Sequence, residues 1–161
     1  MIDAEQLCRA FARNTSILEM QTAGLSHKDS LLQTPYSINC MNWTLGHILV
    51  YRDRAITSSG GNAQFPNGEL DRYQRESEPI TEDGPGVLPL AELVAAIESS
   101  QAALNGSLGE LTDDAFAAES EVDGRMVSLA KRLHFDYFHD TYHTGQTELL
   151  RQVAGTEDQI I

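Results

Sequence analysis

The chain has 161 residues, a length typical of one domain with its own hydrophobic core. Hydrophobic residues make up 41% and charged residues 22%, as in globular proteins rather than disordered or fibrous ones. Lys and Arg number 11 against 24 Asp and Glu, so the formal net charge is -13. Because such a surface repels phosphate groups, we expect no binding to nucleic acid or to an anionic membrane.

The N-terminal segment and the two cysteines predict a cytoplasmic protein. The first residues, MIDAEQLCRAFARN, are polar and amphipathic and lack the apolar stretch of a signal peptide. No apolar run reaches the roughly 20 residues that a membrane-spanning helix needs. Cys8 and Cys40 have no CxxC spacing and are too few for a disulfide framework. We interpret both as small buried residues in a reducing compartment.

Four segments carry apolar residues at helical spacing, and none alternates as a strand does. In chain order they run from about Asp3 to Thr22, Asn42 to Ser59, Pro89 to Leu111, and Ser128 to Gly155. We expect Asp3 to cap the first helix and Gly24 to end it. The second should be entered through Ser37 or Asn39 and end at Gly60-Gly61.

Two polar connections separate these helices. The stretch from Gly60 to about Val87 is too long for a tight turn, so it should cross the domain and leave the second and third helices parallel. The stretch from Thr112 to Met126 is acidic, with a turn signal at Asp123-Gly124. It should contain a short helix or an irregular pair of extended segments.

Amphipathic helices of this number bury their apolar stripes most simply by packing together. The predicted fold is therefore all-α: a single domain over residues 1–161, built as a four-helix bundle with a long crossover between helices 2 and 3.

Three histidines lie on stripes that should face the interior. His139 and His143 are four residues apart on the last helix, which places both rings on one face. His47 lies on the second helix between Trp43 and Tyr51, where an apolar residue is expected. A buried imidazole without a partner costs roughly 1–3 kcal/mol, and one shared divalent cation satisfies all three. Three protein ligands with open positions are typical of catalytic metal sites.

The spacing alone also allows three separately satisfied core histidines, since a pair at i,i+4 arises by chance in roughly one such chain in ten. His27, in a loop-like segment, and His134, turned off the ligand face, are interpreted as surface residues. Gly46, next to His47, leaves room for another helix or a ligand to come close.

Two segments resemble signatures of a known family. Asn42–Ile48 (NWTLGHI) resembles the NWxxGHI signature of the DinB/YfiT-like metalloprotein superfamily, and His139–Gln146 (HDTYHTGQ) resembles its HxxxHxGQ signature. The number and order of helices, the long connection before the third helix and the late position of the paired histidines match as well, so the resemblance covers essentially the whole chain. It implies a DinB-like bundle, often homodimeric, whose metal triad corresponds to His47, His139 and His143.

The resemblance also implies one divalent metal ion, nickel or zinc first, with iron or manganese as alternatives. Family members with known activity are mostly thiol-dependent transferases and isomerases that use bacillithiol, mycothiol or glutathione-like cosubstrates, and others are hydrolases. The connection between the second and third helices matches no active subgroup, so the resemblance does not assign a substrate.

Four side chains near the triad are candidates for supporting the metal or contacting a substrate. Asp136 either accepts a ring N–H of His139 or is a solvated acid at the mouth of the bundle. Gln146 either hydrogen-bonds a ligand or belongs to a cap or polar network. Tyr51 and Arg54 are placed to line the approach to the metal and receive an anionic substrate, although an ion pair with a surface acid is the preferred interpretation of Arg54.

Three functions follow from this pattern. In the first, an enzyme, the metal helps a water or thiol to lose its proton and attack a small electrophilic molecule, as in a thiol S-transferase or a hydrolase. The second is a non-catalytic metal-binding or stress-response protein. The third is a metal-free dimeric interaction module. An open pocket with a metal-bound water favours the enzyme. A dry, closed pocket without Tyr51, Arg54 or Gln146 in reach favours the second function.

Overall fold

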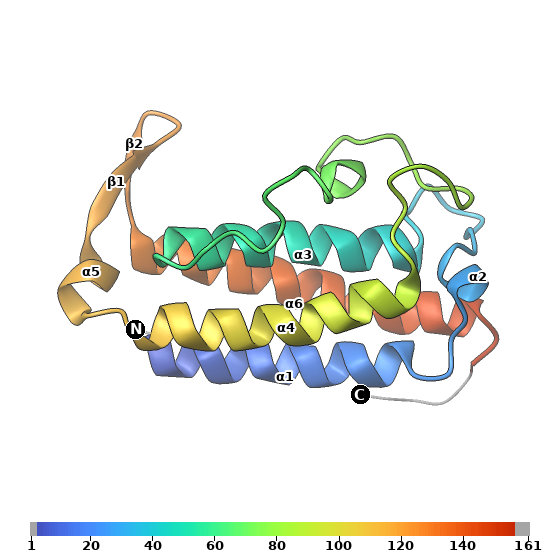
Figure 1. Cartoon of the computed structure of the whole chain (residues 1–161), viewed down its shortest axis with the longest axis horizontal. Helices are drawn as coiled ribbons and strands as arrows, with labels where there is room; N and C mark the ends of the chain where they lie inside the picture. Colours follow the sequence, from blue (N-terminus) through green and yellow to red (C-terminus); the bar gives the residue numbers. More distant parts are fainter. Residues whose placement is uncertain (1–2, 157–161) are drawn as a thin grey trace.

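The computed structural model describes residues 3–156, and these are mostly helical, which confirms the all-α class. Four long helices lie side by side along the molecule (Figure 1). They occupy the four segments expected from the periodicity, and their bounds are α1 Ala4–Thr22, α3 Met41–Ser58, α4 Leu90–Gly109 and α6 Leu129–Val153.

The packing partners and directions of these helices set up the site. Both α1 and α3 contact α4 and α6. In Figure 1 the sequence colours run one way in α3 and α4 and the opposite way in α1 and α6, so α3 and α4 are parallel. The chain between them passes back along the outer side of α3 and contains a short 3-10 helix, η1 (Asp71–Tyr73). This is the orientation that the length of the connection predicts.

The helix starts differ in how they are capped. The Asp3 carboxylate accepts a hydrogen bond from the Gln6 backbone N–H at 2.7 Å, and the Gln6 side chain accepts one from the Asp3 N–H. The expected cap of α3 by Ser37 or Asn39 is wrong, because α3 begins after Cys40 with no side-chain cap. Ser37 and Asn39 instead line a surface hollow.

The short helix α2 (His27–Ser30) packs near the start of α4. It begins at a residue expected to be a solvated loop histidine, and that expectation is wrong. The Nδ1 atom of His27 accepts a hydrogen bond from the Leu90 N–H at 3.1 Å. It therefore satisfies one of the free N–H groups at the start of α4, where Pro89 offers no side-chain cap. His134 is exposed, as expected.

A helical turn and a β-hairpin connect α4 to α6, so both predicted alternatives for this segment are present. α5 (Asp113–Ala117) is followed by the antiparallel strands β1 (Glu119–Val122) and β2 (Arg125–Ser128). Asp123 and Gly124 form the turn, with φ of 50° and 74°. The hairpin projects from the end of the helices (Figure 1).

The core is divided by a buried polar layer. Buried apolar side chains form two clusters, one around Leu45, Ile48 and Leu93 and the other around Leu7, Phe11 and Leu104. Of the two cysteines, Cys40 is buried as expected, whereas Cys8 is partly exposed.

The layer between the clusters is centred on an ion pair. Arg52 Nε donates to Asp140 Oδ2 at 2.7 Å, and both side chains are fully buried. Arg52 also donates to Thr15 and Ser100, and Asn14 donates to the other carboxylate oxygen at 2.7 Å. Asp140 thus points into the core and joins all four long helices through hydrogen bonds.

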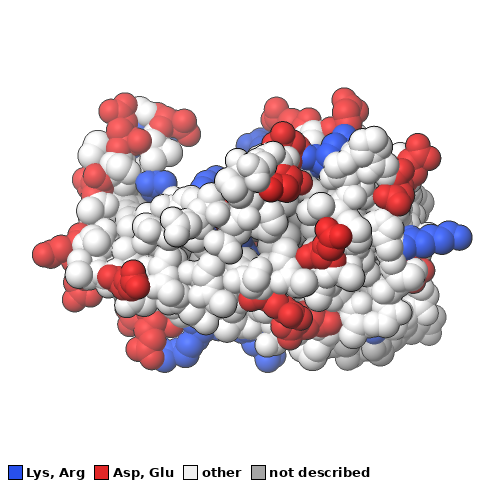
Figure 2. All heavy atoms as spheres, viewed as in Figure 1, with Lys and Arg blue, Asp and Glu red and all other residues white. Residues whose placement is uncertain are grey.

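Among the described residues, no helix is long and apolar enough to cross a membrane. Acidic side chains are spread over the face seen in Figure 2, and basic ones are fewer.

Candidate metal centre

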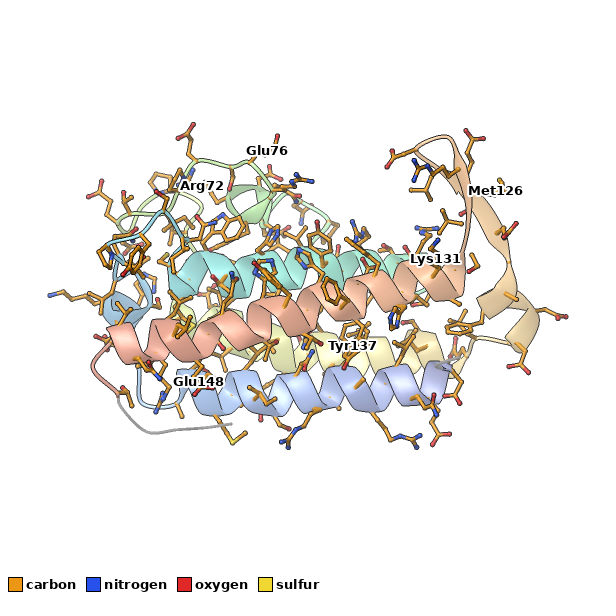
Figure 3. All side chains as sticks on the ribbon, turned by 180° about the vertical axis from the view of Figure 1, so that it is seen from behind. Arg72, Glu76, Met126, Lys131, Tyr137 and Glu148 are labelled. Carbon is orange, nitrogen blue, oxygen red and sulfur yellow. The ribbon has the colours of Figure 1, made fainter. Side chains whose placement is uncertain are left out.

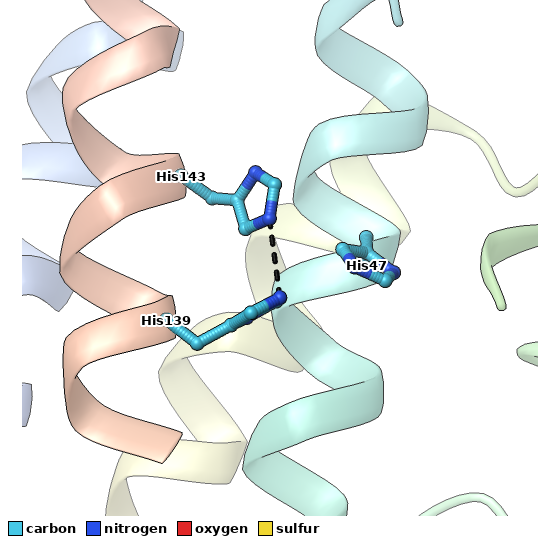
Figure 4. Close-up of side chains that lie close together, drawn as sticks. All are labelled: His47, His139 and His143. Atoms are coloured by element: carbon cyan, nitrogen blue, oxygen red, sulfur yellow. Dashed lines mark hydrogen bonds between the residues drawn. The ribbon is translucent and has the colours of Figure 1, made fainter. Parts of the chain in front are cut away.

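The structure brings the three predicted histidines together between α3 and α6 (Figure 4). The rings of His139 and His143 project from α6 toward α3, which carries His47. Ring centroids are 4.4–5.0 Å apart, and the three ligand nitrogens all lie within 4.8 Å of one another. Two nitrogens that are each about 2.1 Å from one ion are at most about 4.2 Å apart. Sub-ångström side-chain shifts therefore suffice for a common ion.

Hydrogen bonds define the free nitrogen on two of the rings. His47 Nδ1 lies 2.6 Å from the Tyr73 carbonyl oxygen, and His143 Nδ1 lies 2.7 Å from the Gln146 amide oxygen. Because these oxygens only accept, each Nδ1 carries the hydrogen and each Nε2 keeps its lone pair. Histidines that ligate metals are typically held in this way, by donation from the other ring nitrogen to a carbonyl or carboxylate.

His139 completes the group but leaves the hydrogen bonding unbalanced. Its Nε2 lies 3.2 Å from His143 Nε2, and its Nδ1 is buried without a partner. With the proton on Nδ1, two lone pairs face each other. With the proton on Nε2, a buried Nδ1 lone pair lacks a donor, which costs about 1–3 kcal/mol. A cation held by the three Nε2 atoms would use all of their lone pairs and leave only the Nδ1–H of His139 unpaired.

Aromatic side chains hold two of these rings in place. Trp43 stacks on His47 with centroids 4.3 Å apart, and Tyr51 stacks on His139 at 3.4 Å. Trp43 is buried, as expected for a core residue, and its indole N–H donates to Ser77 at 3.0 Å.

The η1 residue Tyr73 explains the glycine next to His47. A Cβ on Gly46 would overlap the Tyr73 ring, so the missing side chain admits the connection rather than another helix or a ligand. The backbone carbonyl of the same Tyr73 holds His47. Sequence reasoning missed Tyr73, although large apolar residues within a mostly polar connection, Phe65, Leu70, Tyr73 and Ile80, were a signal that part of it is buried.

Burial keeps the three rings neutral. It lowers the pKa of His47 to about 4 and that of His139 to about 3, and it also lowers the pKa of His143. Neutral imidazole is the form that binds metal, so no proton has to be displaced near pH 7.

The four supporting candidates occupy distinct places. Asp136 is buried and ion-paired with Arg54, whose Nε donates to its carboxylate at 3.0 Å. Asp136 is therefore neither an acceptor for His139 nor a solvated acid, and both predicted alternatives are wrong. Arg54 pairs with this buried acid and not with a surface acid, so that expectation is also wrong. Burial raises the pKa of Asp136, and Arg54 opposes that rise. Arg54 also lies over the Tyr51 ring, 4.1 Å from its centroid. Gln146 is the acceptor that orients His143.

One surface hollow reaches the histidine cluster, and a second lies near it. One of about 240 Å³ is lined by His143, Gln146, Trp43 and Tyr142, together with residues 37–39. The other, of about 360 Å³, is lined by Arg54, Asp136 and residues of the hairpin and α6. The cluster is therefore not sealed inside the protein, because His143 lines the first hollow.

Comparison with known proteins finds a similar fold but no similar sequence. No family profile matches the chain, and no curated protein sequence is similar to it. Its fold is similar to the crystal structure of a conserved protein of a locus from Enterococcus faecalis, with a TM-score of 0.76 and 15% sequence identity. The match covers 97% of this chain and 99% of the other. At that identity the likeness extends to the fold alone.

Proposed function

We propose that the chain is a DinB-like four-helix-bundle protein that holds one divalent metal ion through His47, His139 and His143. The observation that carries the proposal is the nitrogen geometry: two rings are fixed by donation to carbonyl oxygens, and each of the three rings has a nitrogen within 4.8 Å of one in the other two. Imidazole ligands suit zinc, nickel or iron. The resemblance to the DinB-like proteins puts zinc or nickel first and adds manganese as an alternative.

We further propose that the site is catalytic and acts on a small electrophilic molecule, as a thiol S-transferase or a hydrolase. A bound divalent ion supplies a lowered pKa for a coordinated water or thiol. The chain's own residues position the ligands: the Tyr73 carbonyl holds His47, and Gln146 holds His143. The hollow of about 240 Å³ beside His143 limits a substrate there to a small molecule or one end of a larger one.

A homodimer is part of the proposal. Large apolar side chains on one face of α6 stay 39–60% exposed, namely Phe138, Tyr142, Leu149 and Val153. A second copy that presents the same face would cover them in a symmetric interface. Light scattering after gel filtration should give twice the mass of 17.7 kDa, and L149E should give the monomer. A monomeric wild type would refute the dimer.

The test is elemental analysis of protein purified without an affinity tag, followed by activity assays with the metal found. Glutathione-like thiols with electrophilic acceptors test transfer, and activated esters and amides test hydrolysis. Turnover that is lost in H143A and kept in H134A supports the enzyme. One bound metal without turnover on either class leaves the non-catalytic metal-binding function, and no metal refutes the proposal.

A further inference from the structure

A second cluster of charged side chains lies near the histidines, and the ring of Tyr51 stands between the two. The hairpin rises beside the start of α6, and between it and α3 is the hollow of about 360 Å³. Figure 2 shows this depression at the base of the hairpin, with basic atoms in it, and Figure 3 shows Lys131 on α6 below the hairpin that carries Met126.

The hollow gathers positive charge in an acidic protein. Arg54, Lys131 and Arg132 line it, three of the 11 basic residues of a chain with net charge -13. Two acids line it as well, Asp136 and Asp123. Asp136 is already paired with Arg54.

Two of the three cations have no acidic partner. Within residues 3–156, neither Lys131 nor Arg132 forms an ion pair. Arg132 donates only to the hydroxyl groups of Ser120 at 3.2 Å and Ser58 at 2.9 Å. These two bonds fix the guanidinium between the hairpin and α3 and leave its other N–H groups free. Against the single charge of Asp123, the two cations leave one positive charge unmatched.

The rest of the wall is apolar and leads toward the triad. Val122 and Val127 of the hairpin and Phe135 of α6 line the hollow, and Phe135 is 51% exposed. On the inner side, Arg54 lies over Tyr51, and Tyr51 stacks on His139. A molecule in the hollow would thus be separated from the histidines by one aromatic ring.

We propose that this hollow binds a small organic carboxylate. Lys131 and Arg132 bind the carboxylate group, and Phe135 with the two hairpin valines packs against the apolar part of the molecule. One unmatched positive charge suits one carboxylate, and the apolar wall suits an aryl or alkyl body better than a fully hydrated anion. Binding here is independent of a metal; only its use as the substrate subsite rests on the proposed function.

The experiment follows backbone amide shifts in two-dimensional NMR spectra of chelator-treated wild type, K131A and K28A during titration with benzoate. Lys28 is also an exposed lysine, but it lies on α2, away from the hollow. Benzamide, the neutral analogue, and inorganic phosphate are titrated in parallel. R132Q is not the main variant because Arg132 also ties the hairpin to α3.

Benzoate should shift the amides of residues 122–127 and 131–136 saturably, and K131A should raise its dissociation constant about three- to fivefold while K28A leaves it unchanged. Equal binding of benzamide, or equal effects of K131A and K28A, would overturn the role of charge. Phosphate binding as tightly as benzoate would overturn the apolar contact. Because metal is absent throughout, this result is separate from that of the metal titration described in the Discussion.

Discussion

Two polar clusters of α6 contain the neighbouring residues Asp140 and His139 and differ in their hydrogen bonding: Asp140 is fully buried, and His139 is half-buried. Asp140 points into the core, where Arg52, Asn14 and the hydroxyl of Thr15 complete the network. The ring of His139 projects from α6 toward α3. Its Nδ1 has no hydrogen-bond partner among residues 3–156, and its Nε2 lies 3.2 Å from His143 Nε2. The hydrogen bonds of Asp140 are satisfied within the protein, whereas ring nitrogens of the histidine cluster keep lone pairs that no protein donor uses. We base the proposed metal site on these unused lone pairs beside a surface hollow, and not on the burial of polar groups alone.

The largest expected effect on stability comes from removing one partner of the buried Arg52–Asp140 ion pair. R52A leaves the buried Asp140 carboxylate without its ion-pair partner, which should lower the free energy of unfolding by about 3–5 kcal/mol. Urea denaturation should show the same loss with and without chelator, because this layer does not depend on metal. The double variant R52M/D140L should lose clearly less than R52A. Equal losses would mean that packing, and not the unpaired charge, sets the cost.

The histidine cluster should make the stability of the metal-free protein fall as the pH is lowered. The folded-state pKa values of His47 and His139, about 4 and about 3, lie below the unfolded value of 6.5. As pH falls below 6.5, the unfolded chain takes up protons that the folded chain does not, so stability falls until pH reaches the folded values. Between pH 7 and pH 5 the loss should be on the order of 2–4 kcal/mol.

Urea denaturation of chelator-treated protein at several pH values measures this slope. H139Q should remove about half of it, and H134Q, which changes an exposed histidine, should leave it intact. A slope that is the same in wild type and H139Q would contradict the assignment of the acid sensitivity to the cluster.

Gly46 links the connection to the histidines. G46A should push the Tyr73 ring away, destabilise the protein by about 1–3 kcal/mol and weaken metal binding, because the Tyr73 carbonyl would no longer hold His47. G106A is the matched control: Gly106 also lies in a long helix, but a Cβ there meets nothing within 4 Å. It should be neutral or stabilising by up to about 1 kcal/mol. Calorimetric melting and metal titration of both variants test this contrast.

The smallest expected effect is on the orientation of one ring. Q146L removes the acceptor of the His143 Nδ1–H and should weaken metal binding about tenfold, with little change in the stability of the metal-free protein. Q146E keeps an acceptor and should retain most of the affinity. If Q146L and Q146E bind metal as the wild type does, Gln146 does not orient His143.

Helical periodicity was sufficient to predict the long helices and the meeting of the three histidines. The third helix, expected from about Pro89 to Leu111, runs over Leu90–Gly109. The pattern predicts this because residues three and four apart share a face whatever the tertiary context. His47 could be assigned to the same site as His139 and His143 because it lies in the middle of an apolar stripe, where an apolar residue is expected.

The hydrogen-bond partners of the buried polar side chains could not be predicted from the sequence. The buried residues of α6 form one stripe that contains Asp140, whereas His139 and His143 lie beside this stripe and are half-buried. Arg52, the partner of Asp140, is 88 positions away. The Asp136–Arg54 pair spans 82 positions, and the carbonyl of Tyr73 comes from an irregular connection with no periodicity. Such contacts depend on how the helices pack, which no local pattern specifies.

The central claim is that the histidine cluster is completed by one metal ion. Isothermal titration of Zn²⁺ into chelator-treated protein tests it most directly, with wild type, H139A and H134A compared at pH 7.5. The account predicts one zinc ion per chain for wild type and H134A, and a loss of at least tenfold in affinity for H139A. No saturable binding to the wild type, or equal binding by H139A and wild type, would contradict it.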